Sequence, residues 1–244
     1  MPSTLDRNQT LGELVARQPA AAPVLEHYQM DYCCGGSTKI EAACSSAGIT
    51  VEQLSREIAA AAPVNGTTAT DWTQAALPDL IAHIVAAYHQ RLRAWLPELE
   101  ALASKVVRAH GSQHAELESL RLQLESLATE LRSHMEKEEY ILFPYIEQLA
   151  QLTPGQAGHA RPSFGSLRHP LSVMLREHAD AGEALAAMRR LSGDYVMPGD
   201  ACPSWRRFYS SLAELEAELH AHIHLENQIL FPRAEELEKA VEDA

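Results

Sequence analysis

The spacing of apolar positions predicts four long helices in the second part of the chain. Leucines and other apolar residues recur there every three or four positions, which is the period of an α-helix with one buried face. The pattern places these helices near 78–109, 113–149, 169–191 and 203–239. Long amphipathic helices joined by modest loops are typical of a four-helix bundle, so we expect an all-α protein.

The first part of the chain predicts shorter helices. A threonine followed three positions later by Glu or Gln marks a helix start, because the two side chains cap each other's backbone N–H groups. Three such pairs occur, at Thr10–Glu13, Thr38–Glu41 and Thr50–Gln53. We therefore expect a small helical domain at 1–62, a polar linker at 63–76 and the bundle at 77–239.

One pattern occurs twice in the predicted bundle. The stretch H-x-x-x-E-x-x-I-L-F-P begins at His134 and again at His222, 88 positions later. Residues four apart lie on one side of a helix, so His134 pairs with Glu138 and His222 with Glu226. Flanking leucines mark this side as the buried one. Burying an imidazole and a carboxylate without partners is costly, and a metal ion offsets that cost.

Two other predicted helices each carry an inward histidine. His89 and His178 stand at core spacing and are 89 positions apart, so the second half of the bundle repeats the first. A single inward histidine is more often a core residue than a metal ligand, but a symmetric set of six side chains indicates a metal site. The six are His89, His134, Glu138, His178, His222 and Glu226.

The ligand types indicate the metal. A structural zinc site has four ligands, typically including cysteine, whereas this set has six and no thiolate. Two carboxylates can bridge two ions, and imidazoles on either side suit iron. We interpret the set as a non-haem di-iron site with two iron ions and with carboxylate and oxo bridges. Manganese or mixed metals are the alternatives.

Several glutamates near these residues are candidates for a supporting role. Glu130 and Glu218 lie one turn before the histidines of the repeat, and Glu177 precedes His178. Each can accept a hydrogen bond from an imidazole N–H group and so orient a ligand. The alternative is that these glutamates lie on the surface in contact with solvent. Glu136 and Glu139 are expected to point away from the ligand face into solvent.

Composition excludes several classes of function. The net charge of −13, without a basic stripe, argues against nucleic acid and membrane surfaces as partners. No apolar run reaches the roughly 18 residues of a membrane-spanning helix, and the N-terminus does not read as a signal peptide. Four cysteines in 244 residues do not form a disulfide scaffold. We therefore expect a cytoplasmic protein.

The stretch D-Y-C-C-G-G carries the other candidate chemistry. Cys33 and Cys34 precede two glycines and a predicted helix start. A thiol near a helix N-terminus can have a lowered pKa and act as a nucleophile or a metal ligand. Two small buried residues in a turn are the alternative.

Taken together, four motifs resemble those of the iron–sulfur cluster repair di-iron proteins, also called repair of iron centres. They are D-Y-C-C-G-G at 31–36, H-M-E-K-E-E-Y-I-L-F-P at 134–144, S-V-M-L-R-E-H at 172–178 and H-I-H-L-E-N-Q-I-L-F-P at 222–232. The resemblance covers about residues 8–236 and implies a hemerythrin-like bundle. It implies the same six metal ligands and a functional pair at Cys33 and Cys34. The Pro- and Gly-rich stretch near 153–168 is longer than the family pattern.

The resemblance also implies a function. Members of this family help to restore iron–sulfur clusters damaged by nitric oxide or oxidants, so the implied partners are damaged iron–sulfur proteins, with nitric oxide or oxygen as small ligands. The implied route is donation of iron from a labile di-iron centre, with Cys33 and Cys34 assisting transfer or docking. The alternatives are a hemerythrin-like carrier or sensor of nitric oxide or oxygen, and a nitric oxide reductase. Whether the protein is an enzyme is therefore undecided at this point. Whether the protein forms a homodimer is also undecided at this point.

Overall fold

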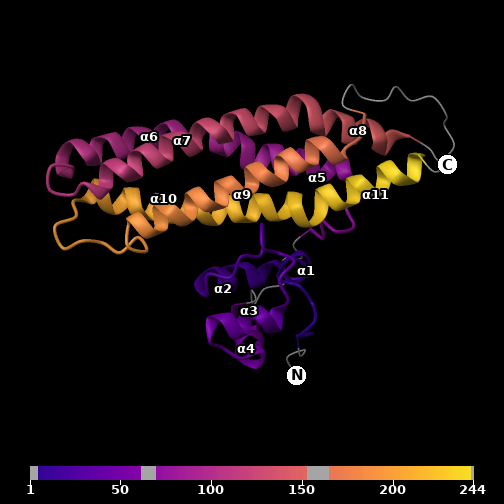
Figure 1. The fold of residues 1–244 in the computed structure, drawn as a ribbon, viewed down its shortest axis with the longest axis horizontal. Helices are drawn as coiled ribbons and strands as arrows, with labels where there is room; N and C mark the ends of the chain where they lie inside the picture. Colours follow the sequence, from indigo (N-terminus) through magenta and orange to yellow (C-terminus); the bar gives the residue numbers. More distant parts are fainter. Residues whose placement is uncertain (1–4, 62–69, 153–164, 243–244) are drawn as a thin grey trace.

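The computed structural model describes residues 5–61, 70–152 and 165–242, and these residues form an all-α protein, as predicted. The one isolated β-bridge among them pairs Thr10 with Lys39. A long bundle and a smaller helical domain lie side by side (Figure 1). No helix of the described part is long and apolar enough to cross a membrane. Part of the expected linker lies outside the described residues.

The small domain is built from short helices around its own apolar core. They are α1 (Leu11–Arg17), η1 (Pro19–Ala21), α2 (Ala22–His27), α3 (Ile40–Ala47) and α4 (Val51–Ala61). The capping box predicted at the start of α1 is present, because the Thr10 side chain accepts from Glu13 N and the Glu13 side chain accepts from Thr10 N. At the start of α4, Gln53 N donates to Thr50 Oγ1 at 3.1 Å.

The capping box predicted at Thr38 is wrong. Helix α3 begins at Ile40, and its N-cap residue Lys39 makes no side-chain capping bond. The backbone before the helix is held elsewhere, because Leu11 N donates to Thr38 O and Ile40 N donates to Gln9 O, both at 2.9 Å. A tertiary contact with the segment before α1 therefore overrides the local capping signal.

The bundle consists of four long helical rods close to their predicted positions. Three of the rods are each divided by one π-helical turn, the segments η2, η3 and η4. The elements are α5 (Leu77–Ile84), η2 (Val85–His89), α6 (Gln90–His110), α7 (Glu116–Lys137), η3 (Glu138–Leu142), α8 (Phe143–Gln151), α9 (Arg168–Leu191), α10 (Pro203–Leu225), η4 (Glu226–Leu230) and α11 (Phe231–Glu242).

Prolines follow two of the π-turns directly. In η3, Phe143 N bonds to the Glu138 carbonyl five residues back, and Pro144 follows; in η4, Phe231 bonds to Glu226 in the same way, and Pro232 follows. Proline has no N–H, and its ring clashes with the carbonyl four residues earlier in a regular α-helix. A wider turn relieves that clash, so the repeated I-L-F-P sequence fits the repeated distortion.

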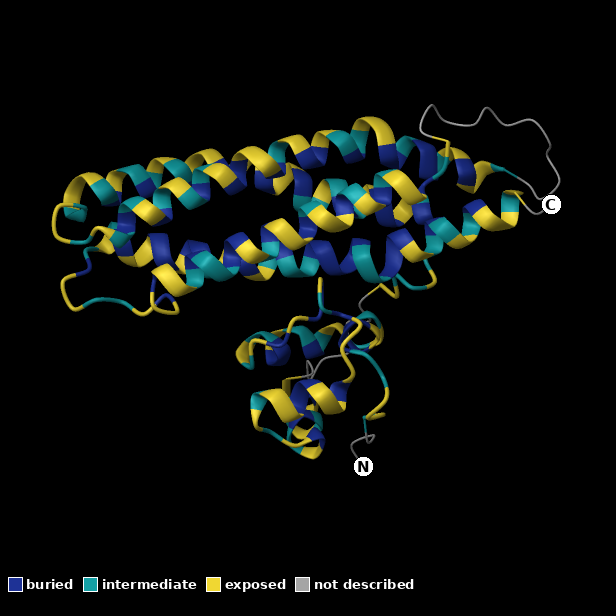
Figure 2. Ribbon diagram, in the orientation of Figure 1, coloured by how far each residue is buried: buried dark blue, intermediate teal, exposed yellow. Residues whose placement is uncertain are grey.

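Two apolar clusters fill the bundle, and a polar layer separates them. One cluster contains Leu92, Leu131 and Leu219 and extends toward the α6–α7 turn, whereas the other contains Ile84 and Leu142 and extends toward α8 and α11. The buried positions run along the inner side of every rod (Figure 2). Polar groups between two dry layers are largely removed from water, so they require partners inside the protein.

The small domain packs against the rod formed by α10 and η4. Three side chains of that rod reach it: His220 Nδ1 lies 2.7 Å from Glu26 Oε1, His224 Nδ1 lies 3.2 Å from Tyr32 O, and Gln228 Nε2 donates to Cys33 O at 2.9 Å. A Cβ on Gly36 would lie 2.5 Å from Gln228 Nε2 and 2.6 Å from Tyr32 O. Glycine at position 36 therefore permits the close approach.

Candidate metal centre

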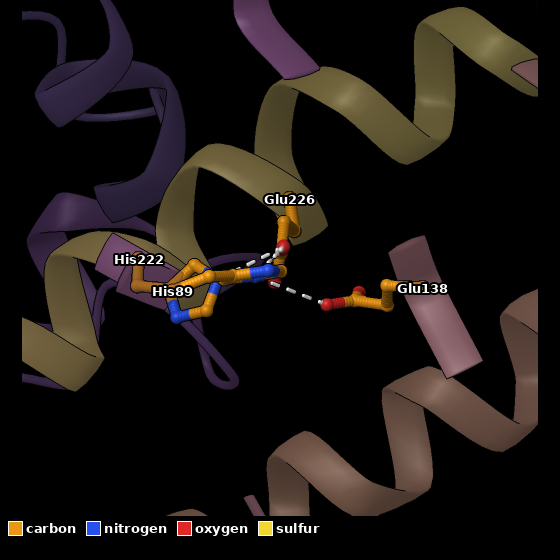
Figure 3. A group of neighbouring side chains, drawn as sticks. All are labelled: His89, Glu138, His222 and Glu226. Carbon is orange, nitrogen blue, oxygen red and sulfur yellow. Dashed lines mark hydrogen bonds and ion pairs between the residues drawn. The ribbon is translucent and has the colours of Figure 1, made fainter. Parts of the chain in front are cut away.

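The polar layer holds the six side chains that the repeat predicts, and the structure brings all of them together. Each is at most 4% exposed. Their potential ligand atoms form two groups in which all atoms lie within 4.8 Å of one another, and both groups contain the same two carboxylates (Figure 3 shows the first group). The groups are His89, Glu138, His222 and Glu226, and His134, Glu138, His178 and Glu226.

The four imidazole rings face one another through their Nε2 atoms. The distance between the Nε2 atoms is 3.1 Å for His89 and His222, and also 3.1 Å for His134 and His178. Glu138 Oε2 lies 3.4 Å from His89 Nε2 and 3.3 Å from His134 Nε2. One carboxylate thus reaches a histidine of each pair.

Glu226 does the same from the opposite rod. Its Oε1 lies 3.0 Å from His222 Nε2, and its Oε2 lies 3.2 Å from His178 Nε2. The arrangement therefore has two positions, each with two imidazoles, and both carboxylates are shared between the positions. We refer to them as the His89/His222 position and the His134/His178 position.

Three of the four rings have a hydrogen-bond acceptor behind them. His89 Nδ1 lies 2.7 Å from Glu139 Oε1, His134 Nδ1 lies 2.9 Å from Glu177 Oε2, and His178 Nδ1 lies 2.7 Å from Asn227 Oδ1. Two of these acceptors are carboxylates, so the ring proton resides on Nδ1. The Nε2 lone pairs then point into the centre, as metal binding requires.

Several atoms in the layer have no hydrogen-bond partner among the described residues. They are both carboxylate oxygens of Glu138, Glu226 Oε2 and His222 Nδ1, all of them buried. Two buried carboxylates and facing imidazole lone pairs are unfavourable together unless a cation lies among them. The donor set of four imidazoles and two shared carboxylates fits two divalent ions of the first transition series.

The protonation of the layer is dominated by its carboxylates. Burial by itself lowers the pKa of His134, but Glu138, Glu177 and Glu226 outweigh it and raise that pKa to about 10. The hydrogen bond from His134, together with Lys137, lowers the pKa of Glu177 to about 2. Without metal, protons on His89, His134 and His178, whose pKa values the carboxylates raise, help to neutralise the acids. Metal binding must displace these protons and is therefore linked to proton release.

A cleft of about 350 Å³ gives access to the layer. It lies along α7 and α9, and His134, His178 and His222 all line it. Lys137 and Glu177 form an ion pair on its wall. Small ligands or ions therefore have a route from the surface to histidines of both positions.

Comparison with known proteins agrees with this geometry. Residues 80–234 match the hemerythrin HHE cation binding domain, and residues 7–62 match ScdA_N, a domain of unknown function (DUF542). Proteins named iron-sulfur cluster repair protein YtfE from Enterobacter sp. (strain 638) and Edwardsiella ictaluri are both 40% identical to the chain over 230 residues. A protein of the same name from Escherichia coli O8 is 39% identical over 230 residues. Each match covers 93% of this chain and 97% of the relative.

The chain belongs to the iron–sulfur cluster repair family of hemerythrin-like proteins. Its bundle is the cation-binding domain of that family, as the sequence resemblance indicated. The family assignment covers both domains, because the small domain is also part of the aligned length.

In this member of the family, the C-C-G-G segment lies against a ligand-bearing helix. Cys34 Sγ lies 3.4 Å from the carbonyl oxygen of His178, and the Cys34 side chain is exposed in a second cleft of about 460 Å³. Cys33 is buried, with its Sγ 3.3 Å from Asp31 Oδ1 and 3.9 Å from Cys34 Sγ.

The two thiols have opposite properties. The hydrogen bond from Cys33 lowers the pKa of Cys34, whereas the same bond and burial raise the pKa of Cys33. Cys33 is thus a buried hydrogen-bond donor, and Cys34 is an exposed thiol with a lowered pKa. The sequence alone treats the two as equivalent.

The predicted supporting glutamates divide into one that reaches a ligand and two that make other contacts. Glu177 contacts His134, but Glu130 accepts from Ser126 Oγ at 3.1 Å and Glu218 pairs with Arg91 at 3.1 Å. Glu136 is exposed, as expected.

The prediction that Glu139 points into solvent is wrong, because it accepts from His89 and pairs with Arg93 at 2.8 Å. Asn227 was not predicted either. These two residues occupy the same place in the two copies of the repeat, one after each shared carboxylate. Their equivalent positions in the repeat were the sequence signal from which both supporting residues could have been found.

Proposed function

We propose that this protein repairs iron–sulfur clusters damaged by nitric oxide or oxidants by donating iron from a two-iron centre. The observation that carries the proposal is the pair of two-histidine positions that share Glu138 and Glu226. The repair role comes from relatives named iron-sulfur cluster repair protein YtfE, at 40% identity over most of the chain. Damaged iron–sulfur proteins are then the partners, and the iron is the cargo.

In this proposal, His89, His134, His178 and His222 would supply imidazole ligands to two ions, and Glu138 and Glu226, which both positions share, would supply the carboxylates. Bound iron supplies one-electron chemistry and open positions for small ligands. Glu139, Glu177 and Asn227 keep the rings oriented with their Nε2 atoms inward. The apolar clusters pack on either side of the layer and limit the entry of water to the cleft along α7 and α9.

In the proposal, the small domain assists the transfer of iron from the bundle to the damaged protein. Its exposed thiol, Cys34, lies beside the backbone of His178 in a cleft open to solvent. A thiolate is a good ligand for iron in transit between the bundle and a cluster protein. The proposal places this transfer in the cytoplasm, where thiols stay reduced.

The decisive experiment measures recovery of a client enzyme. Iron-loaded protein is mixed with a hydratase whose [4Fe–4S] cluster has been inactivated by nitric oxide, and hydratase activity is followed over time. We expect recovery with the wild type, a large loss with Cys34→Ser, and full recovery with Cys202→Ser as the matched control. Cys33→Ala is expected to fall between them, because it removes only the donor to Cys34.

The outcomes separate the competing functions. No recovery with the wild type would contradict iron donation and favour a carrier or sensor of nitric oxide or oxygen, for which the cleft beside His134 gives the route. Equal recovery with wild type and Cys34→Ser would remove the thiol from the mechanism but leave iron donation in place. Formation of nitrous oxide by the reduced protein would indicate a reductase.

A further inference from the structure

The two positions of the centre are related by the repeat, but their histidines are supported unequally. Each position contains one histidine backed by a carboxylate: His89 by Glu139, and His134 by Glu177. The difference lies in the second histidine of each position. His178 has Asn227 behind it at 2.7 Å, whereas His222 Nδ1 has no hydrogen-bond partner among the described residues.

The repeat identifies the residue responsible for the difference. Glu177 immediately precedes His178 and supports His134 of the neighbouring rod. The corresponding residue, immediately before His89, is Tyr88. It faces His222 of its own neighbouring rod, but the two rings stack, with centroids 5.2 Å apart and planes 11° from parallel. Tyrosine thus replaces the acceptor with a flat apolar contact.

Stacking and hydrogen bonding have different effects on a ligand. Both restrict the plane of the ring, but only an acceptor at Nδ1 fixes the tautomer and makes Nε2 more basic. Removing such a partner commonly costs about 10- to 100-fold in metal affinity. His222 therefore binds metal more weakly than His178, although both stand beside the same carboxylate, Glu226.

We propose that the two ions are held unequally, and that the ion bound by His89 and His222 is the exchangeable one. The ion at the His134/His178 position stays behind and keeps the layer assembled. Tyr88 is the positioning residue that makes the first ion exchangeable. On the proposed function of iron donation, which this inference rests on, the ion at the His89/His222 position is the one that is donated. His222 lines the cleft along α7 and α9 together with His134 and His178, so the cleft is a route to solvent from both positions, and the difference between the ions rests on the support of His222.

The first test measures iron release directly. The full-length protein is loaded anaerobically with ferrous iron, and release to the chelator ferrozine is followed by absorbance. We expect two phases of about one iron each, with rates that differ by about 10- to 100-fold. A single phase for both ions in the wild type would overturn the inference.

Variants then assign the phases. Tyr88→Glu supplies the missing acceptor and is expected to slow the fast phase toward the slow one, whereas Tyr88→Phe keeps the stacked ring and keeps the fast phase. Glu177→Tyr mirrors the change and is expected to accelerate the slow phase. Lys137→Met removes the ion pair with Glu177 but leaves the acceptor in place, so it controls for loss of that pair.

His222→Ala decides the assignment if a partly buried glutamate at position 88 prevents folding. It is expected to retain about one iron per chain and to lose the fast phase alone. Loss of the slow phase in His222→Ala, or acceleration of the fast phase in Glu177→Tyr, would reverse the assignment and overturn the inference. Release is measured without a client protein, so a failure of cluster repair would not be mistaken for a failure of this inference.

Discussion

The inner and outer faces of the two repeat-bearing rods differ sharply in how well the repeat is preserved. On the inner faces, His134 and Glu138 have close counterparts in His222 and Glu226, and all four are buried. On the outer face of the second rod, the small domain is held by three side chains. These are His220, His224 and Gln228.

The matching outer face of the first rod has no such cover among the described residues. The residues in register are Arg132, which pairs with Glu100, Glu136, which is exposed, and Tyr140, which is 76% exposed. The inner faces have stayed alike because both supply the same chemistry to one centre. The outer faces have diverged because the small domain packs against only one of them, which gives a pseudo-symmetric bundle an asymmetric exterior.

The strongest test of the inner-face equivalence is replacement of the shared carboxylates. Because Glu138 and Glu226 each belong to both positions, we expect either Glu→Ala change to lower the affinity for both ions, and the double variant to hold almost no iron. Metal analysis of the purified variants measures iron per chain. Iron content that is undiminished in the double variant would remove these residues from the site.

A second test compares the aromatic residues of the two I-L-F-P stretches. Phe143 stacks on His89 and Phe231 stacks on His178, both with centroids 5.8 Å apart, and both phenylalanines are 2–3% exposed. Deleting a buried phenylalanine side chain costs about 3–5 kcal/mol. We expect Phe143→Ala and Phe231→Ala to lower the free energy of unfolding of the metal-free protein by similar amounts in urea denaturation. A difference above about 2 kcal/mol would show that the two halves are not equivalent in packing.

The outer faces should respond unequally to matched changes. Gln228→Ala removes the donor to the Cys33 carbonyl and is expected to cost about 1 kcal/mol. Its counterpart Tyr140→Ala lies on the uncovered face and is expected to stay within about 0.5 kcal/mol of the wild type. Hydrogen exchange of amides in α2 and α3 reports the docking, and faster exchange is expected with Gln228→Ala alone. Equal exchange in both variants would argue that this bond does not hold the domain.

The smallest expected effect is a pH dependence confined to the covered face. Burial lowers the pKa of His224 to about 4, whereas an unfolded histidine titrates near 6.5. Below pH 6.5 the unfolded chain therefore binds a proton at this histidine, whereas the folded protein does not. The contribution of His224 to the free energy of unfolding is fully present above pH 6.5 and is lost as the pH falls toward 4. Between pH 7.5 and 6 the loss is about 1 kcal/mol.

Denaturation at several pH values checks this prediction. The variant His224→Gln is expected to lose less stability than the wild type over the same range, since glutamine does not titrate. Glu136→Gln, the corresponding change on the uncovered face, serves as the control and should follow the wild type. Identical pH profiles for all three proteins would contradict the assignment of the effect to His224.

The sequence was informative wherever one helix face determined the outcome. Apolar periodicity gave the rods, and the register of the repeat selected His134, Glu138, His222 and Glu226 for the interior. It failed where a neighbouring element decided. Glu139 lies about 100° around its own helix from Glu138, so the pattern placed it in solvent. Only the packing of the neighbouring rod, which carries His89, shows that Glu139 has a hydrogen-bond partner there.

The π-turns were also invisible to a periodicity argument, because each differs from a regular helix by a single residue. Prolines hinted at a distortion at 144 and 232 but not at its kind. The third turn, at Val85–His89, has no proline after it. The cap at Thr38 failed for the same reason as Glu139, since contacts distant in sequence replaced a local preference.

The π-turns carry a consequence for how the chain tolerates insertion and deletion. A π-turn holds one residue more than the α-helical turn it replaces, so deleting the exposed Tyr140 or Ile141 would let the rod revert to regular helix while its far part keeps nearly the same facing. A residue deleted from the regular helix α7 would instead rotate everything beyond it by about 100°. Leu142 and Phe143 would then leave the core while exposed neighbours entered it. The π-turn thus absorbs a change of one residue that the regular helix before it does not tolerate.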